Sequence, residues 1–149
     1  MKRIILICSL LITTYSYGQI VNKKVQRIAK KNVEIFLSPK FDKTAKVIVD
    51  IEKGTRKVED KSQGIANYVT TAFIQLGVDV INEGAGNSIV FTIKWAALDE
   101  LKRMSGTIFD SNSNVVGTIE YNGPYIPNSH KNIATAIAYK FVQAVQMRN

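Results

Sequence analysis

The residues whose types and spacing best suggest chemistry form the stretch DSNSNVVGTIEY, residues 110–121. Asp110, Asn112 and Asn114 stand at the first, third and fifth positions of an EF-hand-like calcium loop. Such a loop also needs glycine at position six and glutamate at position twelve, where this chain has Val115 and Tyr121. Asp, Ser and Asn are also typical of a tight hairpin, because they tolerate left-handed backbone and bond their own main chain. We therefore predict a turn between two strands.

Other catalytic patterns are missing from the sequence. His130 is the only histidine, and we expect it to face solvent in the first turn of a helix. No serine stands in a Gly-x-Ser-x-Gly elbow, and the glycine pair at 84–86 leads into a strand pattern, unlike a nucleotide-binding loop. Of the paired carboxylates, Asp50 and Glu52 share one face of an expected strand, which is typical of a solvated surface, and Asp99 and Glu100 lie at an expected turn. A carboxylate hydrolase stays open as an alternative, but we predict no enzyme activity, no metal and no cofactor.

The first eighteen residues, MKRIILICSLLITTYSYG, predict a signal peptide. Lys2 and Arg3 supply its positive charge, Ile4–Ile12 its apolar centre, and residues 16–18 a small-residue cleavage site. The apolar run is too short to span a membrane. Cys8, the only cysteine, lies inside it, so the mature chain is expected to have no disulfide and no thiolate site. We predict an exported protein, in the periplasm or associated with the outer membrane, and not transmembrane.

The charge of the mature chain is concentrated near its start. Without Lys2 and Arg3, 18 basic residues stand against 12 acidic ones. Five of the basic residues fall within residues 23–31: Lys23, Lys24, Arg27, Lys30 and Lys31. Such a cluster binds anionic glycans, lipid headgroups or nucleic acid, or is simply solvated. If the segment is helical, the stripe of Val21, Val25 and Ile28 opposite the charges is a poor membrane anchor.

One aromatic side chain completes the set of candidate interaction residues. Tyr125 lies between Gly123-Pro124 and Pro127 in an expected loop, which makes it the best exposed aromatic residue of the chain. Trp95 and Tyr121 fall on apolar strand faces and are expected in the core. A single ring is no stacking platform, and nucleic acid is not expected as a partner.

The elements that must position these residues follow from hydrophobic periodicity. Period-two alternation predicts strands over 33–38, 47–51, 78–81, 89–95, 105–110 and 115–121, with 89–95 the longest and a central one. In the first strand, Glu34, Phe36 and Ser38 lie opposite the apolar face.

Helical spacing predicts two helices. The first covers 60–76, with Asp60 or Ser62 as its cap and Gly77 at its end. The second covers 128–146, with Asn128 or Ser129 as its cap. Its buried stripe is expected to consist of Ile133, Ile137, Phe141 and Ala144.

These elements predict an α+β fold, with two helices packed on one face of a mostly antiparallel sheet of about five or six strands. The expected organisation is a signal peptide at 1–18, a basic segment and first strand at 19–45, and a single α+β domain at 46–149.

Five stretches of the chain carry a resemblance to a known group: KVIVDIEKG, SQGIANYVTTAFIQLGVDVI, SIVFTIKW, SGTIFDSNSNVVGTIEYNG and IATAIAYKFVQAV. Together they resemble small bacterial envelope domains similar to the TolB amino-terminal domain and the CsgG-like assembly proteins. The resemblance implies a non-catalytic periplasmic or outer-membrane-associated module that contacts other proteins, and it carries over no site residue. Members of the group are often lipoproteins, and this chain departs from that pattern.

Two functions follow from these observations. The first is an exported interaction module, an accessory or assembly component of the cell envelope. It predicts an apolar patch or an exposed sheet edge that a protein partner covers. The alternative is a binder of anionic polymer or lipid through residues 23–31, with binding that weakens steeply as salt increases.

Overall fold

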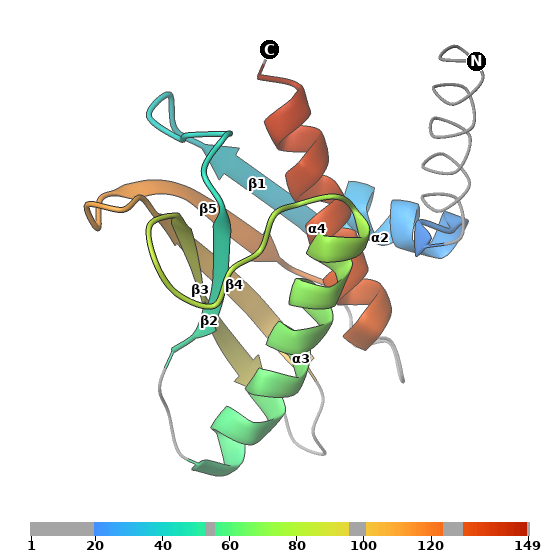
Figure 1. Cartoon of the computed structure of the whole chain (residues 1–149). Helices are drawn as coiled ribbons and strands as arrows, with labels where there is room; N and C mark the ends of the chain where they lie inside the picture. The colour runs from blue at the N-terminus through green and yellow to red at the C-terminus, as the bar shows by residue number, and fades with distance from the viewer. Residues whose placement is uncertain (1–19, 53–55, 96–100, 124–129, 149) are drawn as a thin grey trace, which may run out of the picture.

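A computed structural model describes residues 20–52, 56–95, 101–123 and 130–148 of the protein (Figure 1). The helices are α2 (Lys23–Asn32), α3 (Arg56–Gln75) and α4 (His130–Gln146). The strands are β1 (Val33–Leu37), β2 (Val47–Ile51), β3 (Asn87–Trp95), β4 (Leu101–Phe109) and β5 (Val115–Tyr121). The α+β class is confirmed, although the described residues contain three helices instead of the expected two. None of these helices combines the length and the apolar character needed to cross a bilayer.

The five strands form one sheet in the order β1-β5-β4-β3-β2. Only the β2–β3 pair is parallel, so the expectation of a mostly antiparallel sheet is confirmed. The strand expected to be a central one, β3, lies inside the sheet between β4 and β2. It is not alone the longest, because β4, which takes the middle position, has the same nine residues. The strand expected at 78–81 is reduced to a single bridge between Val47 and Val80.

The predicted hairpin joins β4 to β5. The carboxylate of Asp110 accepts hydrogen bonds from the backbone N–H of Asn112 at 2.9 Å and of Asn114 at 2.8 Å, and from the Asn114 side-chain amide at 3.0 Å. Ser113 adopts a left-handed backbone with φ of 64°. The Asn114 side chain contributes most to lowering the pKa of Asp110, followed by the backbone N–H of the same residue. The turn chemistry predicted from Asp, Ser and Asn is therefore confirmed.

The start of α3 differs from the prediction. The helix begins at Arg56, so neither Asp60 nor Ser62 caps it. Arg, Lys and Glu are good helix formers, and the residues before Asp60 therefore extend the helix upstream of the expected cap. Ser62 is buried inside the helix, where its hydroxyl accepts a hydrogen bond from the indole N–H of Trp95 at 3.2 Å. Gly77 follows the helix with φ of 82°, in the left-handed conformation predicted for it.

The core combines helix residues with alternate residues of the strands. Ile133, Ile137 and Phe141 of α4 are buried as predicted, whereas Ala144 is half-buried. The strand residues of this core include Ile89, Phe91, Met104, Ile108, Ile119 and Tyr121. Tyr121 is buried, and Trp95 packs half-buried against the same core.

The segment before residue 46 contributes to this core as well. The basic segment, which the sequence analysis considered as a possible helix, forms helix α2. The Asn22 side chain caps this helix by accepting a hydrogen bond from the backbone N–H of Val25 at 3.0 Å. Val21, Val25 and Ile28 are buried, and α2 packs against α4. Strand β1 pairs with β5 along its whole length. Residues 20–45 therefore belong to the same folded unit as the rest of the described chain.

Candidate interaction surfaces

The five predicted basic residues lie together on the outside of α2. Lys23, Lys24, Arg27, Lys30 and Lys31 are all exposed. At 3.6 residues per turn, their side chains fall within an arc of about 120°, which we call the basic face. Within the described part of the chain, no ion pair involves any of the five. Lys30 and Lys31 lie in the last turn, where the helix dipole favours positive charge.

The two remaining sequence candidates have different outcomes. Tyr125 lies outside the described residues. The prediction that His130 faces solvent is wrong, because its ring packs edge-on against Trp95 at 5.6 Å and its Nε2 is buried. That nitrogen has no hydrogen-bond partner among the described residues. The reason is tertiary: the first turn of α4 lies against the end of β3, a contact that helix periodicity does not contain.

One carboxylate pair of the hydrolase alternative, Asp50 and Glu52, is exposed at the end of β2, and the two carboxylates bond different neighbours. The other pair, Asp99 and Glu100, lies outside the described residues. Asp50 accepts from the backbone N–H of Ile51 at 2.8 Å, and Glu52 accepts from the Thr92 hydroxyl at 2.7 Å. Neither lines the hollows at the carboxyl-terminal half of α4. Among the residues that the structure describes, no three of His, Cys, Asp and Glu gather as a metal site.

An exposed aromatic residue on β1 was not among the sequence candidates. Phe36 is 63% exposed, on an edge strand of the sheet. Strand register places it in one row with Thr118, Thr107 and Val90. The alternation of β1 placed Phe36 with Glu34 and Ser38, and an aromatic residue on that polar face was the signal that could have identified it.

The outer edge of β1 offers backbone groups. In the described chain β1 pairs with β5 alone. The N–H of Ser38 donates to the Val116 carbonyl at 2.8 Å, and the N–H of Asn122 donates to the Asn32 carbonyl at 2.9 Å. Even-numbered residues of β1 therefore bond β5, and the antiparallel ladder directs the amide groups of Ile35 and its odd-numbered neighbours to the outer edge.

A shallow hollow of about 400 Å³ lies beside this edge. Residues 35–37 of β1 form one wall, and the end of α4 with Met147 and Arg148 forms the other. Met147 is strongly exposed, and the Arg148 guanidinium donates to the Ser38 carbonyl, which holds Arg148 beside the end of β1. We call residues 35–37, Met147 and Arg148 the β1 edge surface.

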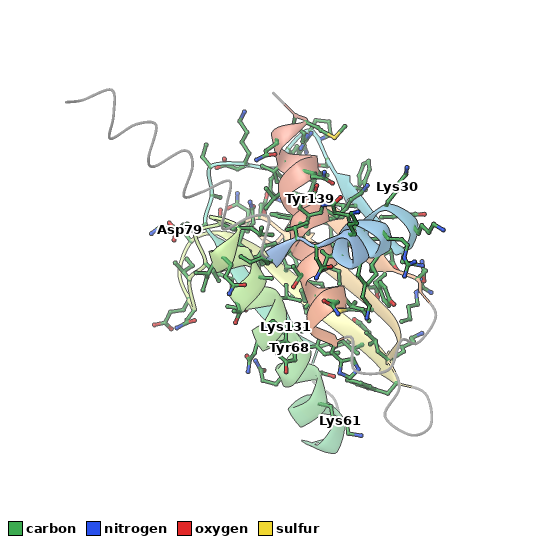
Figure 2. The ribbon with its side chains drawn as sticks, turned by 90° about the vertical axis from the view of Figure 1, so that its right-hand side faces the viewer. Lys30, Lys61, Tyr68, Asp79, Lys131 and Tyr139 are labelled. Carbon is green, nitrogen blue, oxygen red and sulfur yellow. The ribbon has the colours of Figure 1, made fainter. Side chains whose placement is uncertain are left out.

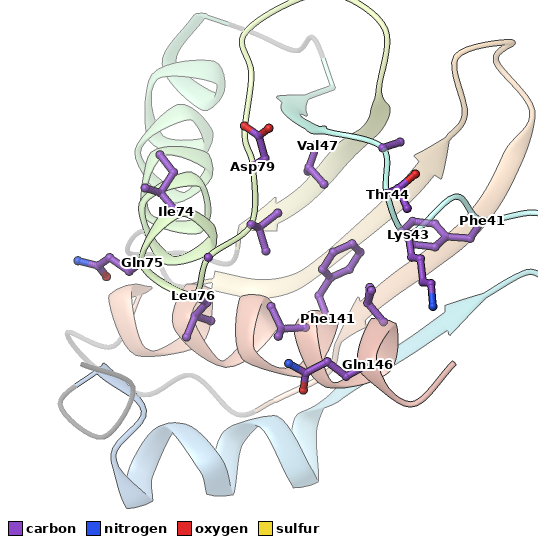
Figure 3. Close-up of a pocket in the computed structure, with 15 residues that line it drawn as sticks. Phe41, Lys43, Thr44, Val47, Ile74, Gln75, Leu76, Asp79, Phe141 and Gln146 are labelled. Atoms are coloured by element: carbon purple, nitrogen blue, oxygen red, sulfur yellow. The ribbon is translucent and has the colours of Figure 1, made fainter. Parts of the chain in front are cut away.

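A larger hollow of about 720 Å³ opens between the end of α3, the second half of α4 and the stretch before β2 (Figure 3). Its apolar wall includes Phe41 and Phe141, which meet edge to face at 5.9 Å. Lys43 and Asp79 contribute polar groups, and Asp79 forms an ion pair with Lys46 at 3.6 Å. The sequence did not indicate this hollow, because three separate segments build it.

Comparison with known proteins gives no family. No protein-family model and no curated protein matches the chain. Among solved structures, a single-substitution variant of the PelC dodecamer from Paraburkholderia phytofirmans is 18% identical, with a TM-score of 0.47, over 78% of this chain and 98% of that one. Another PelC dodecamer from the same organism is 17% identical, with a TM-score of 0.43, over 76% and 96%. A minor lipoprotein from Acinetobacter baumannii is 16% identical, with a TM-score of 0.28, over 70% and 95%.

With TM-scores below 0.5 and identities below 20%, these likenesses assign neither a family nor a function to the chain. The resemblance to the TolB amino-terminal and CsgG-like group stays a prediction.

Proposed function

We propose that the chain is an exported, non-catalytic interaction module, an accessory or assembly component of the bacterial cell envelope, and that it binds a protein partner at the β1 edge surface. The observation that carries this proposal is Phe36, an aromatic side chain 63% exposed on an edge strand. Aromatic residues exposed beside an unpaired sheet edge are typical of surfaces that a second protein covers. Export follows from the signal-peptide pattern of residues 1–18.

In this proposal the helices pack on one face of the sheet. Ile89 and Phe91 of β3 are buried and pair with the buried residues Ile108 and Gly106 of β4, respectively. The β3 residues that alternate with them are less buried. Helix α4 contacts β1, and α3 contacts β2, which supports the same placement (Figure 1). The opposite face, with Phe36 at one margin, is then open to a partner.

The proposed binding mode is the addition of an extended partner segment to β1. The outward amide groups of Ile35 and Leu37 are available for main-chain hydrogen bonds, and the neighbouring hollow accepts an apolar side chain. Full burial of a phenylalanine side chain contributes about 1.5–3 kcal/mol. Covering the exposed part of Phe36 is therefore expected to contribute about 1–2 kcal/mol, a factor of about 5–30 in affinity.

Site-specific photo-cross-linking in the native cell envelope tests the proposal. A photoreactive phenylalanine analogue is placed at position 36 and, as a matched control, at position 74, because Ile74 on α3 is similarly exposed at 59%. We expect one defined envelope protein to cross-link from position 36 and not from position 74. The same protein cross-linked equally from both positions, or links only between copies of this chain, would contradict the proposed surface.

Two substitutions and amide exchange then test the binding mode. Phe36→Asp is expected to weaken binding of the identified partner at least tenfold, whereas Ile74→Asp is expected to leave binding unchanged. The two variants are matched, because each introduces one charge at an exposed apolar position. On partner binding, the backbone amides of Ile35 and Leu37 are expected to exchange more slowly, whereas that of Phe36 already bonds β5. Unchanged exchange at Ile35 and Leu37 in the complex would exclude strand addition.

A further inference from the structure

We infer that the basic face of α2 is a binding site for a linear anionic polymer of the acidic polysaccharide class, lying along the helix axis. The site is separate from the β1 edge surface. The choice of a polysaccharide over other linear polyanions rests on the proposed location in the cell envelope.

The basic face holds almost the whole positive surplus of the mature chain. Of the 20 Lys and Arg residues, two precede residue 19 and five form the basic face, which leaves 13 against 12 acidic residues elsewhere. No acidic residue occurs before Glu34. A charge excess gathered on one helix produces a local positive potential, whereas the rest of the molecule is nearly neutral.

The cations are arranged as a line. From Lys23 to Lys31 the helix rises about 12 Å, at 1.5 Å per residue, and the five side chains stay within the same arc of about 120°. A polymer that carries an anionic group on each of several successive units can therefore meet these cations in sequence along one track. Figure 2 shows Lys30 and Asp79 toward opposite sides of the molecule, so acidic Asp79 does not interrupt this track.

The basic face is rigidly held before any ligand arrives. Val25, Ile28 and Ala29 of α2 are buried, and Asn22 caps its first turn. The helix therefore does not have to fold on binding, and little ordering of the backbone opposes association.

The same burial argues against a lipid bilayer as the ligand. An interfacial helix holds to a membrane by inserting its apolar side among the lipids. Here the apolar side of α2 faces α4 in the core and is not available for insertion. The exposed part of α2 is the basic face, a line of cations along the helix. This arrangement matches an extended polymer better than the flat surface of a bilayer.

Binding of purified mature protein to fluorescent heparin oligosaccharide and to polygalacturonate tests this inference. In the variant Lys23→Gln/Arg27→Gln/Lys30→Gln, three exposed cations leave the basic face. The matched control, Lys40→Gln/Lys94→Gln/Lys131→Gln, removes three equally charged and exposed residues from elsewhere on the surface. Circular dichroism is the check that both variants fold.

Salt dependence gives the magnitude. If five cations release counter-ions as they do on duplex DNA, affinity falls about 500-fold between about 50 and 200 mM salt, and about tenfold when two cations remain. For a polysaccharide of lower charge density, the loss of affinity with salt is smaller in both proteins, but it is still larger with five cations than with two. We expect the basic-face variant to lose at least tenfold in affinity at low salt, and the control to stay within about threefold of the unmodified protein.

Three outcomes would overturn the inference: equal losses in both variants, no measurable polysaccharide binding, or basic-face-dependent binding to phosphatidylglycerol vesicles without binding to either polysaccharide. The first would mean that only net charge matters, and the last that the ligand is a lipid surface. Phe36→Asp is expected to leave polysaccharide binding unchanged. Failure of the protein-partner proposal and failure of this one are therefore observed separately.

Discussion

Replacement of Phe141 by alanine is expected to lower the free energy of unfolding by about 3 kcal/mol. Phe141 is 2% exposed and lies where α4 meets α3 and the stretch before β2. Its ring meets Phe73 edge to face at 5.1 Å and Phe41 at 5.9 Å. Phe141→Ala removes the buried ring and both aromatic contacts at once.

The magnitude follows from the burial and from the neighbouring hollow. Phenylalanine-to-alanine changes in a core destabilise by about 3–5 kcal/mol. Phe141 lines the 720 Å³ hollow, so water can enter the vacated space and the loss is expected at the lower end of that range. Phe141→Leu keeps most of the volume and loses the ring contacts, so a loss of about 1–1.5 kcal/mol is expected.

Urea and thermal unfolding followed by circular dichroism measure these losses. For a domain of this size, about 3 kcal/mol corresponds to a fall of about 10 °C in Tm. Phe36→Ala is the matched control, because the same residue type is 63% exposed there and its removal is expected to change stability by less than about 0.5 kcal/mol. Equal destabilisation by Phe36→Ala and Phe141→Ala would refute the assignment of the core.

Two further predictions concern local hydrogen bonds. Asn22→Ala removes the side chain that caps α2 and is expected to lower the free energy of unfolding by about 1 kcal/mol, whereas Asn22→Ser is expected to keep most of that stability. Urea unfolding at neutral pH measures both variants. Equal stability of the two variants and the unmodified protein would refute the cap. The pKa of Asp110 is lowered in the folded state below its ordinary value of 3.8, so its contribution to stability is fully present above that value and is lost as pH falls through the lower folded pKa. The stability difference between the unmodified protein and Asp110→Asn is therefore expected to shrink below pH 3.8, and a difference that grows on acidification would contradict this sign.

The site was predicted from sequence only where its chemistry is local. The basic face depends on residue type and helical spacing within nine residues, so the sequence indicated all five members. The β1 edge surface combines Phe36 with Met147 and Arg148, residues more than 100 positions away. Periodicity assigned Phe36 to the outer face, but it does not say whether another element covers that face.

The sequence by itself determined the features that arise between near neighbours: strands β1, β2 and β3, the Asp110 turn, the left-handed Gly77 and the charged side of α2. Backbone geometry and side-chain spacing act over a few residues, and they need no information about distant segments.

Only the tertiary structure decided which strand takes the middle position, that the Ser62 hydroxyl accepts a hydrogen bond from Trp95, and that His130 packs on Trp95. These outcomes depend on which apolar surfaces meet when the whole chain collapses. The free energy of that burial exceeds the small local preference for an exposed histidine.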